Sequence, residues 1–245
     1  MIIFSDFDRT LFFADDELKT HTNLDAIAKW RARGHQFCIT TGRSAMSVTR
    51  VMPTAEKLCN YFIVDGGSIV LSNTQEILDF LSFDPQTILN ILDFSQKLPE
   101  PPTIFYYTIS SENTTPTTKN VTKLRLWFEN IDTFPAITKQ IRELFPVFAF
   151  HQPATSHYSE LAKYRGFIEI TPVECGKHNA IKRLQENLNI PTNEIITIGD
   201  DLNDYYMIRD FNGYAIHNSK LANDYPNLKT TDSLAAIIKD ILNKP

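Results

Sequence analysis

Short apolar runs alternate with segments of helical periodicity through the first third of the chain. The runs are IIFSDF from residue 2, QFCITTGR from residue 36 and YFIVDGG from residue 61. A helix is predicted from about residue 23 to residue 33, because Leu24, Ile27 and Ala28 share one face. A shorter helix is predicted from Ser44, ending at Pro53. Strands that alternate with helices in this way predict a parallel sheet covered on both faces.

The pattern changes at about residue 82. Asp84 and Pro85 predict the start of a helix that runs to about residue 98, since Asp caps helices and proline is tolerated at the first helical position. Aromatic, β-rich runs follow, TIFYYTI and KLRLWFE, separated by a polar loop. A helix at about 133–144 then precedes two more strands, VFAFH and FIEI. This order, a helix followed by two strands, occurs twice and predicts an antiparallel sheet with helices on one face.

The α/β pattern resumes after Pro172, where KHNAIKRLQENL is amphipathic, EIITIGDD is a predicted strand, and DYYMIRDF and DSLAAIIKDIL are predicted helices. We therefore predict an α/β fold with a Rossmann-like parallel-sheet core formed by residues 1–81 and 166–245. Residues 82–165 are predicted to form an inserted α+β domain that acts as a cap.

Composition and charge exclude some classes of partner but do not identify the function. The chain has 245 residues, 42% of them hydrophobic, and a formal net charge of -5, which is typical of a soluble globular protein. Because no Lys/Arg cluster is present, nucleic acid and anionic membranes are not expected partners, and a small diffusible substrate fits better. Three widely spaced cysteines predict reduced packing residues. With no secretory signal and no apolar run near the roughly 20 residues of a membrane span, a cytoplasmic location is expected. The sequence predicts no oligomeric state.

The acidic stretch after the first strand allows two interpretations. Asp6, Asp8, Thr10 and Glu17 match four positions of a calcium-binding loop. That loop needs glycine at its sixth position, where this chain has Leu11, and it joins two helices rather than following a strand. We therefore interpret the stretch as the end of a strand that presents carboxylates to a ligand.

A second acidic cluster, GDDLND at residues 199–204, follows another apolar strand. Alone it could be a solvated turn. At neighbouring ends of parallel strands, however, Asp6, Asp8 and Asp200 would repel one another unless a hard cation lay between them. Oxygen-only ligands indicate Mg²⁺. Ligands also collect at this edge of an open α/β sheet.

Two further motifs could bind a phosphate. In ITTGR, glycine lets backbone N–H groups approach an anion, the threonine hydroxyl donates a hydrogen bond, and Arg43 offers a fork of donors. Lys177 begins a predicted helix, although its Gly-Lys pair is not a P-loop, since residue 171 is Thr where glycine is required and His178 follows the lysine. Each motif alone could be an ordinary turn or a surface residue.

Together, DFDRT, TTGR, Lys177 and GDDLND occur in the order and spacing of the four motifs of the haloacid dehalogenase (HAD) superfamily of phosphohydrolases, which the chain resembles over essentially its whole length. The insertion between the second and third motifs resembles the Cof-type and sucrose-phosphatase-like branch with a type II α/β cap. The resemblance implies a Mg²⁺-dependent phosphomonoester hydrolase whose substrate is a small phosphorylated metabolite such as a sugar phosphate. A phosphomutase like the phosphomannomutases, or a binding protein without turnover, remains an alternative.

The resemblance also implies residue roles. Asp6 would attack phosphorus to form an aspartyl-phosphate. Asp8 would protonate the leaving oxygen and then deprotonate the water that cleaves the intermediate. Mg²⁺ would be held by the Asp6 carboxylate, the Asp8 main-chain carbonyl and Asp200.

A further set of residues would bind the phosphate: Thr41, Gly42, Arg43 and Lys177. Asn203 would orient the hydrogen bonds of that set. Thr40, next to Thr41, is an alternative for the binding hydroxyl. Asp204 would lie behind the metal ligands or hold Lys177, and Thr10 would support its loop through its hydroxyl.

Two positions depart from the pattern of the family. Residues 65–68 read Asp-Gly-Gly-Ser where an Asn-Gly pair is common, which leaves a substrate contact there open. Arg9 replaces a small residue, and its side chain is expected to face away from the nucleophile. On the predicted cap strand, Lys123, Arg125 and Trp127 alternate with leucine and phenylalanine, so Arg125 faces either solvent or a substrate anion.

Overall fold

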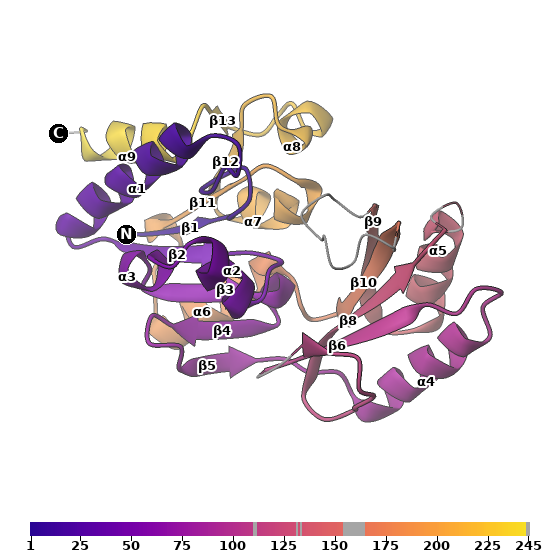
Figure 1. The fold of residues 1–245 in the computed structure, drawn as a ribbon. Coiled ribbons are helices and arrows are strands. Elements are labelled where there is room, and N and C mark those ends of the chain that lie inside the picture. The colour runs from indigo at the N-terminus through magenta and orange to yellow at the C-terminus, as the bar shows by residue number, and fades with distance from the viewer. Residues whose placement is uncertain (110–111, 131, 133, 154–164, 244–245) are drawn as a thin grey trace. The chain divides into compact units, whose positions relative to one another are not determined.

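The computed structural model describes residues 1–243 except 110–111, 131, 133 and 154–164 (Figure 1). Two compact units divide the chain. The first combines Met1–Asp79 with Gly176–Pro245, and the second is the continuous segment Phe80–Cys175. The second unit ends beyond residue 165, where the sequence analysis placed its boundary, because the strand Gly166–Pro172 pairs with two strands of the second unit.

The first unit contains an eight-stranded sheet in the order β13-β12-β11-β1-β2-β3-β4-β5. Five neighbouring pairs, from β13 to β3, are parallel, and β4 runs antiparallel to β3. The strands are β1 (Ile2–Ser5), β2 (Gln36–Thr40), β3 (Tyr61–Val64), β4 (Ile69–Ser72), β5 (Ile77–Phe80), β11 (Ile195–Gly199), β12 (Asn212–Ile216) and β13 (Thr230–Thr231). The predicted parallel α/β sheet is confirmed. Four strands were not predicted: β4 and β5 at one side of the sheet, and β12 and β13 at the other.

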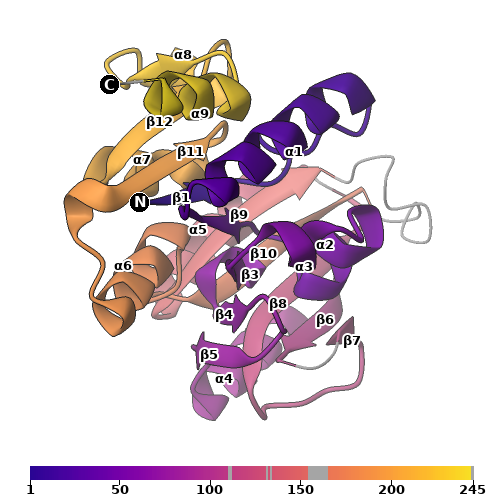
Figure 2. The same cartoon turned by 90° about the vertical axis from the view of Figure 1, so that its left-hand side faces the viewer.

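Helices cover both faces of this sheet (Figure 2). Alternate residues of β1 point to opposite faces. Ile3 packs in one core with Ile27 and Trp30 of α1, while Phe4 packs in the other with Ile181 of α6. The helices of this unit are α1 (Glu17–Ala32), α2 (Ala45–Val51), α3 (Ala55–Leu58), α6 (Lys177–Leu188), α7 (Tyr205–Asp210), α8 (Lys220–Asp224) and α9 (Leu234–Leu242).

Helix α1 begins earlier than the sequence pattern predicts. The Asp16 carboxylate accepts a hydrogen bond from the Lys19 N–H at 2.8 Å and so caps the helix at Glu17. The predicted start at about residue 23 therefore lies inside the helix. Glu17, which completed the calcium pattern, is thus a helical residue, which agrees with rejecting that interpretation.

The second unit is an antiparallel sheet in the order β7-β6-β8-β10-β9, as predicted for a separate cap-like domain. Its strands are β6 (Thr103–Thr108), β7 (Glu112–Asn113), β8 (Val121–Phe128), β9 (Val147–Pro153) and β10 (Gly166–Pro172), and its helices are α4 (Pro85–Gln96) and α5 (Phe134–Leu144). Ile88 of α4 and Ile141 of α5 share one core with Leu124 and Leu126 of β8. Both helices therefore pack on the same face of the sheet.

The other set of β8 side chains carries a buried ionic cluster. Arg125 donates to Glu169, its partner across the β8–β10 ladder, through Nε at 3.1 Å and also through Nη2. The Lys123 ammonium lies 3.6 Å from the same carboxylate oxygen. Burial alone would raise the pKa of Glu169, but Lys123 and Arg125 outweigh it and lower that pKa. In this structure Arg125 is therefore bound to a carboxylate of its own sheet and does not face solvent.

Glu169→Gln should lower the free energy of unfolding of the second unit by about 3 kcal/mol, because two buried cations would lose their counter-charge. Urea unfolding at neutral pH, followed in near-UV signals, measures the loss. Since the pKa of Glu169 is lowered, its stabilisation is present above the ordinary glutamate range and disappears as pH falls through the lowered value. Glu143→Gln, in an exposed pair with Lys139, is the control and should cost less than about 0.5 kcal/mol. Equal losses in the two variants would contradict the prediction.

Among the residues that the structure describes, no helix is both long and apolar enough to cross a bilayer.

Candidate active site

Asp6 follows directly after β1, at the carboxyl end of the parallel strands. Its N–H donates to the Ile198 carbonyl of β11 at 2.8 Å, so the residue is fixed between two neighbouring strands. The chain then turns sharply, since the Phe7 carbonyl accepts from the N–H groups of both Leu11 and Phe12. Strand β1 therefore ends at Ser5, and Asp6 and Asp8 are both outside the strand.

A second acidic pair comes from the end of β11. Asp200 follows Gly199, and the Asp204 carboxylate turns back to accept from the Asp200 N–H at 3.0 Å and the Asp201 N–H at 3.2 Å. This approach requires glycine at position 199, because a Cβ there would lie 2.4 Å from the Asp204 carboxyl group. Oxygens of Asp6, Asp200 and Asp204 consequently lie within 4.8 Å of one another.

Lys177, the first residue of α6, places a buried ammonium in this acidic cluster. Its Nζ lies 2.5 Å from Oδ1 of Asp6 and 2.5 Å from Oδ1 of Asp204. Burial would lower the pKa of Lys177, but the two carboxylates outweigh it and raise that pKa, so the lysine stays charged. The structure thus brings Lys177, Asp6 and Asp204 together and places Asp204 against the lysine.

Three carboxylates around one ammonium leave an excess of negative charge. Burial raises the pKa of Asp6 well above its ordinary value, against the lowering effect of Lys177. Burial also raises the pKa of Asp200 to about 6, and repulsion from Asp204 adds to the effect. A divalent cation would remove this excess, and an all-oxygen donor set suits a hard one. The oxygens of Asp6, Asp200 and Asp204 therefore fit a divalent metal ion, which these residues would hold.

Two residues of the loop after β1, Arg9 and Thr10, act on Asp200. The Thr10 hydroxyl donates to Oδ1 of Asp200 at 3.2 Å, so this hydroxyl holds a carboxylate of the cluster in place. Arg9 adopts a left-handed conformation with φ of +59°, and its side chain is exposed. Its positive charge opposes the rise in the pKa of Asp200 that burial and Asp204 cause.

Asp8 and Arg43 form an ion pair that the sequence did not predict. Arg43 Nε lies 2.7 Å from Oδ2 of Asp8, and Arg43 Nη2 lies 2.7 Å from Oδ1. Such a two-point pair matches the planar guanidinium to the carboxylate and is among the stronger contacts of this kind. The Asp8 carboxylate is thus held by Arg43 in this structure, and is not part of the carboxylate cluster around Lys177.

The remaining predicted residues differ in burial. Thr41 is buried, and its Oγ1 accepts from the Arg43 N–H at 3.1 Å. Thr40, the last residue of β2, is also buried, whereas Gly42 is half-buried. Asn203 is exposed on the 3₁₀ turn Leu202–Asp204. Its part in orienting a phosphate network stays a prediction.

The family is decided by sequence comparison. The model of a family described as haloacid dehalogenase-like hydrolase matches residues 3–222, which is most of the chain. The chain belongs to the haloacid dehalogenase-like hydrolases. This membership confirms the resemblance drawn from the four motifs.

Two curated relatives of this hydrolase match most of its length. A Haemophilus influenzae protein provisionally named a phosphatase is 24% identical and covers 97% of each chain. The Bacillus subtilis protein YxeH, also provisionally named a phosphatase, is 26% identical over 84% of this chain and 83% of its own.

Solved structures share the fold. The phosphatase BT1666 from Bacteroides thetaiotaomicron has a TM-score of 0.76 at 15% identity, covering 98% of this chain and 93% of its own. BT4131, a HAD subclass IIB sugar phosphatase, has a TM-score of 0.74 at 16% identity, covering 98% of this chain and 97% of its own. At these identities the likeness establishes the fold alone.

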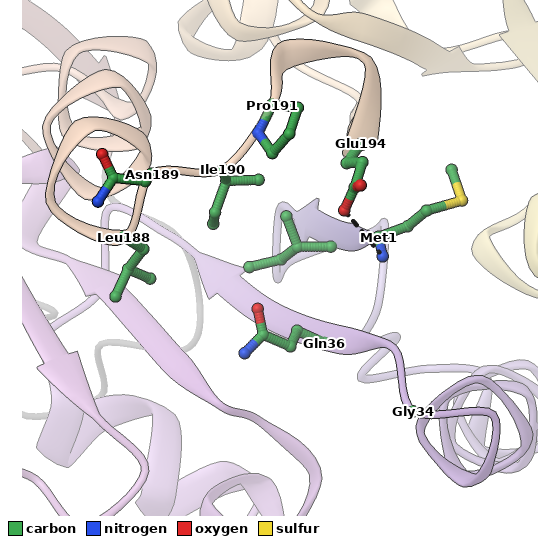
Figure 3. A pocket seen from close by; sticks show the side chains of 9 residues that line it. Met1, Gly34, Gln36, Leu188, Asn189, Ile190, Pro191 and Glu194 are labelled. Carbon is green, nitrogen blue, oxygen red and sulfur yellow. Dashed lines mark ion pairs between the residues drawn. The ribbon is translucent and has the colours of Figure 1, made fainter.

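A pocket of about 260 Å³ lies at the opposite end of the hydrolase sheet (Figure 3). It is lined by Met1 and Ile2 at the start of β1, by Gln36 at the start of β2, and by Glu194 just before β11. The Met1 amino group and the Glu194 carboxylate lie 3.5 Å apart across it. Because Asp6 follows the other end of β1, this pocket is separate from the candidate active site.

Proposed function

We propose that this hydrolase is a Mg²⁺-dependent phosphomonoester hydrolase that acts through an aspartyl-phosphate on Asp6. The observation that carries the proposal is the buried cluster of Asp6, Asp200 and Asp204 around Lys177, at the carboxyl ends of β1 and β11. Family membership supports the same chemistry. A bound Mg²⁺, held by the Asp6 carboxylate, Asp200 and the Asp8 main-chain carbonyl, would neutralise charge so that a carboxylate can approach a phosphate.

The first step forms a bond between an Asp6 oxygen and phosphorus and breaks the ester bond to the leaving oxygen. Asp8 gives that oxygen a proton. In the second step Asp8 takes a proton from water, whose oxygen attacks phosphorus and releases the Asp6 carboxylate and inorganic phosphate. Lys177 binds a phosphoryl oxygen with its buried charge, and the Thr41–Arg43 loop binds the others. For Asp8 to act, its pair with Arg43 has to open, and the incoming phosphate offers Arg43 another anion.

The proposed substrate is a small phosphorylated metabolite, with sugar phosphates as the first class to test. The fold shared with the sugar phosphatase BT4131 supports this choice. We further propose a cytoplasmic location, which the three buried cysteines, none in a disulfide, support.

Removing the metal should abolish activity reversibly. We expect phosphate release from p-nitrophenyl phosphate in Mg²⁺ to fall at least about 100-fold after EDTA treatment, and to return when Mg²⁺ is restored. Full activity in EDTA would contradict the metal assignment.

A panel of sugar phosphates, assayed for free phosphate and for transfer to a second hydroxyl of the sugar, separates hydrolase from mutase. Neither product from any substrate would indicate a binding protein.

A further inference from the structure

The turn at residues 65–68, which follows β3, has no part in the chemistry proposed above. Three of its residues have left-handed backbone angles, with φ of +50° at Asp65, +69° at Gly66 and +97° at Gly67. Ser68 closes the turn, because its N–H and its hydroxyl both donate to the Asp65 carbonyl, at 3.3 and 2.9 Å. Such a conformation is costly for ordinary residues and persists where surrounding structure requires it.

One side of the turn holds the loop that contains Thr41 and Arg43. The Gly66 N–H donates to the Thr41 carbonyl at 3.0 Å, and the Asp65 N–H donates to the Arg43 carbonyl at 2.8 Å. These bonds fix the backbone at both ends of the short loop proposed to bind phosphoryl oxygens.

The other side of the turn contacts the start of α6. A Cβ on Gly67 would lie 2.4 Å from the Gly176 oxygen and 2.5 Å from the Gly176 carbonyl carbon, so no side chain fits between the two backbones. Gly176 directly precedes Lys177, whose ammonium is bound by Asp6 and Asp204. The position of the lysine backbone thus depends on how closely Gly67 approaches Gly176.

Arg183 adds a second attachment between the turn and α6, which packs on β3 and β4 (Figure 1). Its Nη2 donates to the Gly67 carbonyl at 3.0 Å, and its Nε donates to the Asp79 carboxylate at 2.6 Å. Helix α6 is therefore held to the turn both beside Lys177 and further along the helix.

We propose that the Asp65–Ser68 turn is the positioning element that sets the distance between the Thr41–Arg43 loop and Lys177, and that Arg183 is a positioning residue that holds it. The inference rests on the proposed function, since both motifs are proposed to bind one phosphoryl group. Thr41 and Lys177 are far apart in sequence, and the turn is a short backbone path between them. Displacing one group of such a pair by about 1 Å lowers rates by about 100-fold.

Gly67→Ala tests the contact, and Gly34→Ala is its control. Both glycines have positive φ, +97° and +78°, so both variants carry backbone strain, but nothing lies within 4 Å of a Cβ at Gly34. We expect Gly67→Ala to lower kcat on p-nitrophenyl phosphate about 30-fold, with a smaller change in KM, and Gly34→Ala to leave both unchanged. Calorimetric binding of inorganic phosphate with Mg²⁺ should weaken about 10-fold in Gly67→Ala only.

Arg183 gives an independent test if Gly67→Ala fails to fold. Arg183→Met should lower kcat about 5-fold and weaken phosphate binding, and Arg183→Lys should restore part of both, since lysine can still reach Asp79 or the Gly67 carbonyl. The control Lys182→Met removes a neighbouring exposed lysine and should change neither kcat nor phosphate affinity. A merely structural role would lower the melting temperature while leaving kcat and phosphate affinity of the folded protein unchanged.

The outcomes separate the two proposals. Wild-type kinetics and phosphate affinity in both Gly67→Ala and Arg183→Met would overturn the positioning role alone. A wild-type protein that binds phosphate but releases none from any ester would overturn the proposed function, while the affinities of the variants would still decide the role of the turn. A wild-type protein that binds no phosphate would overturn both.

Discussion

Asp6→Asn should lower the turnover of p-nitrophenyl phosphate on the order of 10⁴-fold or more, because an amide oxygen is a poor nucleophile and the covalent step is lost. The fold should survive. The amide oxygen can still accept a hydrogen bond from Lys177, and burial already raises the pKa of the Asp6 carboxyl, so removing its charge relieves repulsion from Asp204 and Asp200. Phosphate release measures turnover, and thermal unfolding without Mg²⁺ measures stability, which should be equal to or higher than that of the wild type.

The matched control is Asp16→Asn, which changes the same atoms at the exposed cap of α1, where asparagine caps equally well. It should leave turnover unchanged. Wild-type turnover in Asp6→Asn would show that another residue is the nucleophile.

Lys177→Met should lower kcat on the order of 10³-fold and also destabilise the protein by about 3 kcal/mol in the absence of metal. Methionine fills a similar volume but leaves Asp6 and Asp204 buried without the ammonium that contacts both at 2.5 Å. Because these carboxylates raise the pKa of Lys177, its stabilisation is complete below the ordinary lysine range and is lost only as pH rises through the raised value. Unfolding at neutral pH therefore measures the full effect.

Magnesium distinguishes the two roles of Lys177. Added Mg²⁺ should restore part of the lost stability of Lys177→Met, since a cation among the carboxylates replaces positive charge, but it should not restore kcat. Lys182→Met, at an exposed lysine of the same helix, should behave like the wild type in both measurements. A Lys177→Met protein as stable and active as the wild type would show that Lys177 is not the counter-charge that Asp6 and Asp204 need.

The sequence predicted the elements of the site because strand ends in a parallel sheet meet at one edge. That rule placed Asp6 and Asp200 together, and in the structure each directly follows one of two neighbouring strands, β1 and β11. The pairing of Asp8 with Arg43 could not be predicted in the same way. After β1 the chain leaves regular geometry, and the direction of the Asp8 side chain then depends on the Phe7–Phe12 turn, which periodicity does not describe.

Three errors in the predicted fold have equally local causes. Helix α1 has almost no apolar stripe in its first turn, so its start depends on the cap at Asp16 rather than on periodicity. Strand β5 is largely exposed, and β13 has only two residues, so neither gives an apolar run. The boundary at residue 165 cut off the strand FIEI, which the helix-strand-strand order already assigned to the antiparallel sheet and which pairs there with β8 and β9.

The adjacency of β1 and β11 also constrains synthesis of the protein. Residues 80–175 form a continuous unit whose sheet needs no later part of the chain, so it can fold while the ribosome is still translating. The central pairing of the other sheet cannot form until residue 199 has emerged, and the ammonium of Lys177 has both its partners only after Asp204. A nascent chain thus carries Asp6, the proposed nucleophile, well before the charges around it are complete, since Asp204 must be synthesised first.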